Sequence, residues 1–229
     1  MYQLFIANKN YSSWSLRPWV LMRERGIAFE EVLRPFVEGG SHAAFVAFSP
    51  TGKVPCLHDG ATVVWDSLAI AEYLAERHAG IWPADPATRA WARSAAAEMH
   101  SGFGALRTHC GMNCGLRVRL HEPRPAALAA DIARVDALWS EGLRRFGGPF
   151  LAGSAFGAAD AFFAPVAFRA QTYGIALSAP AAAYAQRLLA LASMREWYEA
   201  GLAERWRESA HEAEIGQFGT ITADLRRAV

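Results

Sequence analysis

Short apolar runs alternate with turn residues over the first third of the chain, a pattern that is typical of strands mixed with helices. The expected strands cover residues 2–7, 28–34, 54–58 and 62–65, and Asp59-Gly60 is a strong hairpin signal between the last two. A helix over residues 15–25 can stop at Gly26, and another can follow Asp66 or Ser67 up to residue 78. With a short helix before the third strand, this order predicts a small mixed sheet covered by helices.

Beyond residues 80–86, which are rich in Gly, Pro and Asp, the apolar positions follow a helical spacing. The expected helices cover residues 87–107, 126–146, 158–173, 181–191 and 194–207. They predict a bundle of about five helices, while the segment from Ser209 onward has too little periodicity for a prediction. We therefore expect an α/β domain with a mixed four-stranded sheet over 1–79, a linker over 80–87 and an all-α domain over 88–229.

Composition and charge change this picture little, but they limit the classes of binding partner to expect. With 52% hydrophobic residues in 229, the chain can bury a sizeable core. A formal net charge of +1 gives no electrostatic reason to expect nucleic acid or an anionic membrane as a partner. The apolar runs are too short to span a bilayer, and no basic leader precedes the first of them, so we expect a cytoplasmic location.

The three cysteines are odd in number, which argues against a disulfide framework. Cys110 and Cys114, with His109 beside them, could place two metal ligands on one helical face. A zinc site usually needs four ligands, and no second pair exists here, so incidental thiols are favoured over a metal site. Cys56 follows a proline in a strand and is interpreted as a small buried apolar residue.

The first segment with candidate chemistry is residues 11–17, which carries Ser12 and Ser13 between the first strand and the first helix. Free N–H groups and the helix dipole at such a terminus stabilise an anion. A serine hydroxyl there can donate to a bound thiolate and lower the pKa of the thiol. Serine is also a favoured N-cap, which is the alternative for this segment taken alone.

Two further segments carry polar groups at element boundaries. Pro55 stands where a strand begins, so the backbone N–H and C=O of Val54 can face something other than the sheet. A plain turn proline is the alternative. At a strand-to-helix junction, Ser67 and nearby N–H groups can bind a carboxylate while Asp66 balances an ammonium group. The alternative is a pair of N-cap residues.

In this order, the three segments resemble the glutathione transferase superfamily, and the resemblance covers nearly the whole chain. Its thioredoxin-like half is recognised by Gly-Lys-Val-Pro at residues 52–55, followed by Asp-Ser-Leu-Ala-Ile at residues 66–70. The helical half fits through residues 156–161, similar to the family's buried capping-box helix. The Ser-Ser-x-Ser run resembles the zeta class most. Trp14 departs from the cysteine usual in that class, and Gly157 from the usual Ser or Thr cap.

The resemblance implies a serine-type enzyme that takes glutathione as co-substrate, uses no metal and forms a homodimer. Ser12 matches the serine that donates to the glutathione thiolate, with Ser13 next to it, and the match favours Ser12. The positions implied to bind glutathione are Lys53, Val54, Pro55, Asp66, Ser67 and His42. Val54 would pair with the cysteinyl backbone, with Pro55 in the cis form. Asp66 and Ser67 would hold the γ-glutamyl end, and Lys53 and His42 would face the glycyl carboxylate.

The second substrate should contact the first part of the helical half, where residues 97–113 look like a stretch common in a bacterial subgroup of the family. The candidate residues are His100, Phe103, Arg107, Met112 and Asn113. They suit a small hydrophobic electrophile with an acidic or carbonyl end, and plain helix packing is an equal alternative.

The favoured activity is attack of the glutathione thiolate on such an electrophile. Rival interpretations are a glutathione-dependent isomerase, which Trp14 disfavours, an ether-cleaving enzyme and a non-catalytic binding module.

Overall fold

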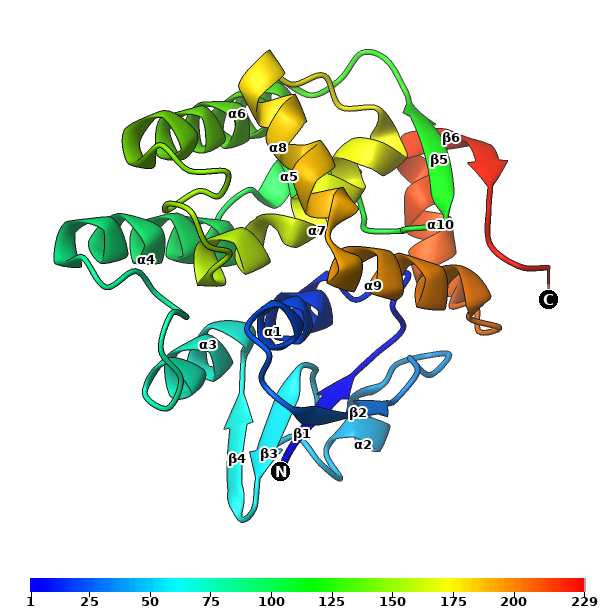
Figure 1. Cartoon of the computed structure of the whole chain (residues 1–229). Helices are drawn as coiled ribbons and strands as arrows, with labels where there is room; N and C mark the ends of the chain where they lie inside the picture. The colour runs from blue at the N-terminus through cyan, green and yellow to red at the C-terminus, as the bar shows by residue number, and fades with distance from the viewer. Residues whose placement is uncertain (229) are drawn as a thin grey trace.

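The computed structural model describes residues 1–228 (Figure 1). The first half contains β1 (Tyr2–Ile6), α1 (Ser13–Glu24), β2 (Phe29–Leu33), α2 (His42–Phe45), β3 (Cys56–Asp59), β4 (Thr62–Trp65) and α3 (Ser67–Ala75). The strands form one sheet in the order β2-β1-β3-β4, with β1 and β2 parallel and the other pairs antiparallel. The mixed four-stranded sheet and its thioredoxin-like fold are therefore confirmed.

Turn residues and apolar alternation account for this half. Gly26 follows α1 at φ +64° and Gly60 joins β3 to β4 at φ +59°, both in the left-handed region that favours glycine. On the inner face, Leu4, Ile6 and Leu57 are fully buried and share one core cluster with the apolar residues of α1. Helices α1 and α3 lie on one side of the sheet and α2 on the other (Figure 1).

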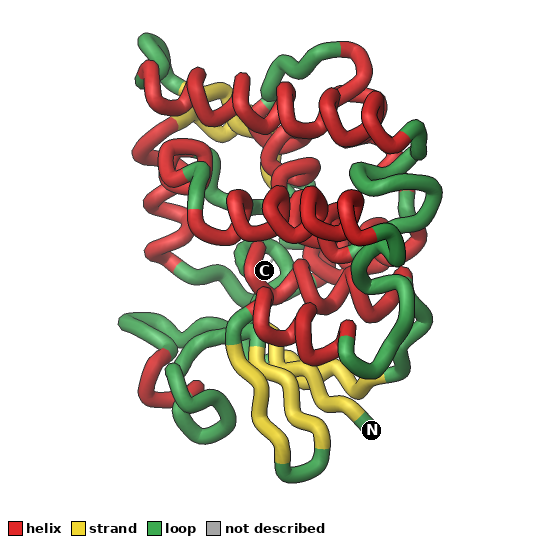
Figure 2. Tube along the Cα trace, turned by 90° about the vertical axis from the view of Figure 1, so that its left-hand side faces the viewer, coloured by secondary structure: helices red, strands yellow, loops and turns green. Residues whose placement is uncertain are grey.

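The helical half begins at α4 and lies above the sheet when the molecule is seen from the side (Figure 2). Its elements are α4 (Pro86–Ser101), α5 (Gly104–His109), β5 (Leu116–Leu120), α6 (Ala126–Phe146), α7 (Ala158–Tyr173), α8 (Ala179–Ala190), α9 (Ala192–Ala203), α10 (Ser209–Phe218) and β6 (Gly219–Asp224). α6 and α7 have the predicted bounds. The helical character of this half is confirmed.

The helical half differs from the prediction in several features: the helix expected over 194–207 ends at Ala203, α10 lies in the segment that had no prediction, and two further differences are larger. The prediction of a single helix over 87–107 is wrong, because α4 ends at Ser101 and α5 begins at Gly104. Between them, Phe103 has a left-handed φ of +55°. Glycines on both sides of Phe103 make this break easy, because glycine is unfavourable inside a helix. The second difference is a two-stranded antiparallel sheet of β5 and β6, where no strand was predicted.

The loop before α1 is fixed by α9 from the other half of the chain. The buried carboxylate that follows α9, Glu204, accepts hydrogen bonds from the backbone N–H groups of Lys9 at 2.5 Å and Asn10 at 3.2 Å. The indole N–H of Trp197 donates to the Lys9 carbonyl at 2.8 Å. The position of the segment that carries Ser12 is therefore set by both halves.

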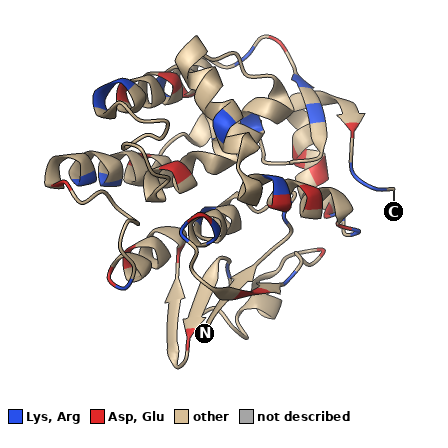
Figure 3. Cartoon of the chain, in the orientation of Figure 1, with Lys and Arg blue, Asp and Glu red and all other residues tan. Residues whose placement is uncertain are grey.

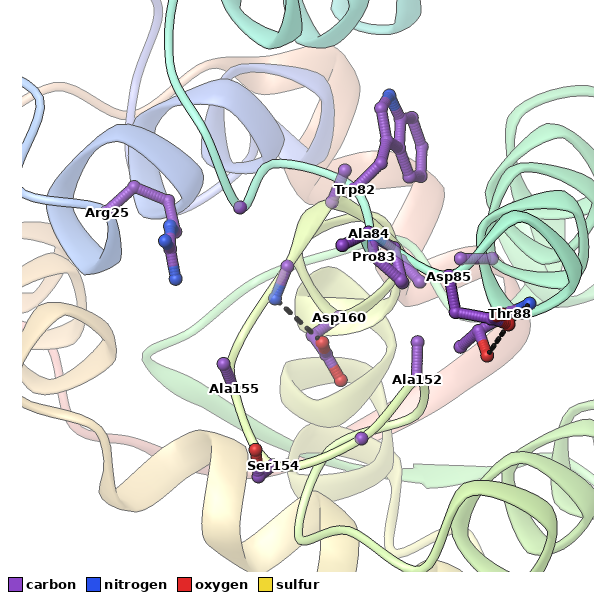
Figure 4. A pocket seen from close by; sticks show the side chains of 16 residues that line it. Arg25, Trp82, Pro83, Ala84, Asp85, Thr88, Ala152, Ser154, Ala155 and Asp160 are labelled. Atoms are coloured by element: carbon purple, nitrogen blue, oxygen red, sulfur yellow. Dashed lines mark hydrogen bonds between the residues drawn. The ribbon is translucent and has the colours of Figure 1, made fainter.

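The N-terminus of α7 is closed by its own carboxylate. Asp160 accepts from the N–H of Gly157 at 2.9 Å, the N–H of Leu151 at 2.9 Å and the hydroxyl of Tyr184 at 2.7 Å. It lies beside a cavity of about 390 Å³ next to Arg25 and Trp82 (Figure 4). Because both carboxylate oxygens are already hydrogen-bonded, Asp160 has a structural role here.

Gly157, one of the two departures from the family pattern, has a steric reason. A Cβ on Gly157 would lie 3.1 Å from the carbonyl oxygen of Ile81, closer than most Cβ contacts. The adjacent N–H of Ala158 donates to that same carbonyl at 2.9 Å. A glycine here lets the segment before α4 approach the start of α7.

Charges are spread over the fold. Acidic and basic residues lie side by side on α4, α6 and α9 (Figure 3), in keeping with the formal net charge of +1. None of the helices in residues 1–228 combines the length and the apolar character that crossing a membrane requires.

Candidate functional site

A cavity of about 920 Å³ opens between the two halves, at the start of α1 and of α3. The predicted site residues that line it are Ser12, Ser13, His42, Lys53, Val54, Pro55, Asp66, Ser67, Arg107 and Met112. Its volume is that of an ordinary small-molecule site. Segments far apart in the sequence are thus brought to one place.

Three residues predicted for the electrophile site lie outside this cavity. The His100 ring lies beside Asp66, with 3.6 Å between its Nε2 and a carboxylate oxygen, and it lines a neighbouring groove. Phe103 is buried edge-on against Phe163. Asn113 is fully buried, and its side-chain oxygen accepts from the N–H of Gly115 at 3.1 Å.

The two serines at the start of α1 are both buried but differ in their partners. Ser12 is the N-cap: its Oγ accepts from the N–H of Ser15 at 3.4 Å and donates to the Oγ of Ser15 at 2.7 Å. Ser13 is the first residue of the helix, and its Oγ accepts from Nη2 of Arg169 at 3.5 Å. Only the Ser13 hydroxyl therefore meets a cation.

The turn before β3 presents backbone groups to the cavity. The Val54–Pro55 peptide bond is cis, as the resemblance implied. Within residues 1–228, neither the N–H nor the C=O of Val54 forms a hydrogen bond. Gly52 has φ +61°, and a Cβ there would lie 2.3 Å from Nδ1 of His42. A glycine is thus required for His42 to lie over this turn, next to the exposed Lys53.

The junction between β4 and α3 has a strained backbone. Asp66 takes φ +73°, rare for a residue other than glycine, and its carboxylate caps α3 by accepting from the N–H of Leu68 at 2.8 Å. Ser67 is fully buried, and its Oγ accepts from Nη1 of Arg17 at 3.4 Å. Such strain persists where the surroundings impose it, often at ligand sites.

Arg17 lies in an aromatic sandwich behind this junction. Its guanidinium carbon is 4.1 Å from the ring centroid of Trp14 and 5.0 Å from that of Phe162. Burial lowers the pKa of Arg17 to about 9, with repulsion from other arginines as a further cause. Trp14, the second departure from the family pattern, thus covers a buried cation and also lines the cavity.

Several lining residues were missed by the sequence analysis: Tyr11, Phe36, Arg169, Glu208, His211 and Glu214. The His211 ring, on α10, stacks between Tyr11 at 4.9 Å and Phe36 at 5.0 Å, so α10 forms one wall. No periodicity signalled α10. Arg169 had a signal, because it is a lone cation in an apolar helix that is buried on nearly every side.

Arginines dominate the electrostatics of the inner wall. Arg107 donates to the carbonyls of His100 at 3.3 Å and Gly102 at 2.6 Å, and burial lowers its pKa. Burial also lowers the pKa of Arg169 to about 10. In the described part of the chain, no group of three or more His, Cys, Asp or Glu side chains could hold a metal ion.

The arrangement can hold an extended, zwitterionic peptide-like ligand. Free backbone groups at Val54 match a peptide bond, and the start of α3 offers N–H groups beside a carboxylate. The start of α1 offers a positive dipole end and a hydroxyl to an anion.

Comparisons with known proteins agree with this geometry. Residues 11–77 match the family model described as glutathione S-transferase, N-terminal domain. No curated protein matches the chain.

Solved structures match over most of the chain. A theta class glutathione S-transferase from Xanthomonas axonopodis pv. citri, with glutathione bound, is 25% identical, with 86% of this chain and 96% of that chain covered and a TM-score of 0.63. A glutathione transferase homolog from Burkholderia, also with bound glutathione, is 24% identical, covering 87% and 97% with a TM-score of 0.61. The tau class enzyme from mango, Mangifera indica, is 19% identical, covering 94% and 97% with a TM-score of 0.69. The zeta-like character of residues 12–15 stays a prediction. Residues 11–77 thus match the N-terminal domain family of glutathione S-transferases, and the chain as a whole has the fold of the solved glutathione transferases.

Proposed function

We propose that this protein is a glutathione transferase that activates the thiol of bound glutathione for attack on a small hydrophobic electrophile. The observation that carries the proposal is the cavity itself. It joins the buried serines of α1, the free backbone of Val54 and the strained Asp66–Ser67 junction in one space of about 920 Å³.

We expect glutathione to bind in this cavity in one orientation. Its cysteinyl backbone would pair with the N–H and C=O of Val54, as in an antiparallel strand. Its γ-glutamyl carboxylate would meet the start of α3 at Ser67, with the ammonium group near Asp66. The glycyl carboxylate would then face Lys53 and His42 at the rim.

The chemistry follows from where the sulfur would lie. The orientation directs it to the start of α1, where a hydroxyl and the positive end of the helix dipole favour the thiolate. A thiol has an unperturbed pKa of about 8.5, so stabilising its anion raises the reactive fraction at neutral pH. This step assigns no role to a metal.

The electrophile would lie against the opposing wall. Trp14, Phe36 and Met112 give this wall apolar surface, and Arg107 adds a cation at one side. Holding both partners in a fixed orientation would supply much of the rate acceleration.

We also propose that the cavity lies between a glutathione-binding domain over residues 1–79 and a helical domain over 88–229. The protein would form a homodimer and act in detoxification. The free, buried thiols of Cys56, Cys110 and Cys114 fit a reducing compartment such as the cytoplasm. Light scattering at micromolar concentration tests the dimer.

The test of the function is binding and conjugation by the purified protein. It should be retained on immobilised glutathione and should conjugate an activated aryl chloride such as chlorodinitrobenzene, and S-methylglutathione should inhibit. Product analysis separates conjugation from isomerisation and ether cleavage. Failure both to bind glutathione and to conjugate any electrophile would instead favour a non-catalytic binding module.

A further inference from the structure

We propose that Ser13, and not Ser12, donates the hydrogen bond to the glutathione sulfur, and that Arg169 of α7 orients and polarises the Ser13 hydroxyl. The inference rests on the proposed function and deepens it. It replaces the assignment of Ser12, which came from the family resemblance.

The Ser12 hydroxyl is already occupied by the fold. It donates to the Oγ of Ser15 at 2.7 Å and accepts from the N–H of the same residue. Ser15 is fully buried, and its Oγ in turn accepts from the N–H of Ala7 at 3.2 Å. Turning the Ser12 proton toward a sulfur would break its buried hydrogen bond to Ser15.

The Ser13 hydroxyl has the opposite situation. It lines the cavity and accepts from Nη2 of Arg169 at 3.5 Å. Among residues 1–228, its own proton has no acceptor. A hydroxyl that accepts from a cation is polarised and becomes a stronger donor. The proton of Ser13 is therefore available for a sulfur anion.

Arg169 supplies the second, independent observation. Its side chain lines the cavity with only 4% of the residue exposed, and its Nε donates to the Cys110 carbonyl at 2.9 Å. No ion pair joins it to a carboxylate anywhere in residues 1–228. A buried charge without a counter-charge is strongly destabilising. An anion bound in the cavity would compensate it.

The other charged groups around the cavity do not replace that anion. The titratable residues that line it are Tyr11, His42, Lys53, Asp66, Arg107, Arg169, Glu208, His211 and Glu214. Glu214 is exposed on α10, and the nearby Cys110 thiol stays neutral because burial raises its pKa to about 11. Arg107 adds repulsion. A thiolate beside Ser13 would lie next to Arg169, the buried cation that no carboxylate pairs with among residues 1–228.

The proposed step is simple in atoms and charge. The S–H bond of glutathione breaks and its proton passes to water, while Ser13 keeps its own proton and donates it as a hydrogen bond to the sulfur anion. The sulfur then forms a bond to the electrophilic carbon, and the leaving group departs with its bonding electron pair. Arg169 acts through Ser13 as a positioning residue.

The test is the pKa of glutathione bound to the full-length protein, measured from the ultraviolet absorbance of the thiolate during a pH titration. Ser13→Ala and Arg169→Met should each raise this pKa by about one unit, a tenfold drop in the thiolate-to-thiol ratio. Ser13→Thr and Arg169→Lys should restore most of the effect. Ser12→Ala should change the pKa less than Ser13→Ala does.

The outcomes separate the two proposals. If Ser12→Ala raises the thiol pKa more than Ser13→Ala, or if Arg169→Met leaves it unchanged, the assignment of Ser13 and Arg169 is wrong while the transferase function stands. If the unmodified protein shows no lowered thiol pKa in its glutathione complex, both are wrong. Should Arg169→Met fail to fold, the pair Ser13→Ala and Ser12→Ala still decides.

Discussion

The first turns of α1 and α7 are both buried where the two halves of the chain meet, yet the fold completes only one of them. At α7, both carboxylate oxygens of Asp160 accept hydrogen bonds from protein donors. At α1, the Ser12 hydroxyl is used by the helix cap. Ser13 and Arg169 line a cavity, where the hydroxyl proton of Ser13 has no acceptor and the charge of Arg169 has no carboxylate partner among residues 1–228.

The difference shows what distinguishes a structural helix terminus from a binding one. Both termini carry residues that serve as caps, so the cap residue alone does not separate them. What separates them is the polar side chain at each terminus: both carboxylate oxygens of Asp160 accept protein hydrogen bonds, whereas the hydroxyl proton of Ser13 has no acceptor among residues 1–228. Buried polar groups are nearly always paired in native proteins, so the free hydroxyl proton of Ser13 makes the start of α1 the terminus at which we expect a ligand to bind.

The largest expected effect is on stability, through Asp160 at the N-terminus of α7. Asp160→Ala leaves the donors of Leu151, Gly157 and Tyr184 buried without their acceptor. We expect a loss of about 3–5 kcal/mol in the free energy of unfolding. Denaturant titration measures it, with Asp160→Asn, which keeps one acceptor oxygen, losing less. A loss under about 1 kcal/mol would show that α7 does not depend on this carboxylate.

The second effect concerns pH. Burial raises the pKa of Asp160 from 3.8 to about 6, so the folded state holds the proton more tightly than the unfolded state. The stability that this group contributes is then fully present below about pH 4 and lost as the pH rises through about 6. The difference in unfolding free energy between the unmodified protein and Asp160→Asn should therefore decrease by roughly 2–3 kcal/mol as the pH rises across that range. Unfolding titrations at several pH values would measure the gap, and a gap that widens with pH would contradict the raised pKa.

The smallest effect separates the two serines by stability instead of chemistry. Ser12→Ala removes an N-cap and should cost about 1 kcal/mol. Ser13→Ala should cost about 0.5 kcal/mol or less, because alanine favours the helix and the bond to Arg169 is long at 3.5 Å. Thermal unfolding without glutathione compares the two. Equal losses would mean that Ser13 also holds the helix in place.

Much of the fold could be predicted because its signals are local. Asp59-Gly60 and Gly26 predicted turns, and the spacing of apolar residues predicted the bounds of α6 and α7 that the structure has. The sheet of β5 and β6 was missed although residues 116–120 do alternate, with Leu116, Val118 and Leu120 buried. An alternating stretch of five residues between helices is easily overlooked without its partner strand, which lies about a hundred residues later in the chain.

The site was predictable only in part, for the same reason. Motifs in the first half indicated one side of the cavity, because each of them is a short run of neighbouring residues. The opposite wall depends on tertiary packing: α10 brings His211 against Tyr11, and α7 brings Arg169 against Ser13. No spacing in the sequence shows either contact.

The hydrogen bonds of Glu204 limit how proteins of this kind can be recombined. The loop that leads into α1 belongs to the first half, but its N–H groups at Lys9 and Asn10 are satisfied by a carboxylate just beyond α9. A chimera that joins the first half of one relative to the helical half of another would leave these groups buried without an acceptor, unless position 204 matched. Exchange of fragments between relatives should therefore preserve the conformation of this loop only when both sides of this contact are inherited together.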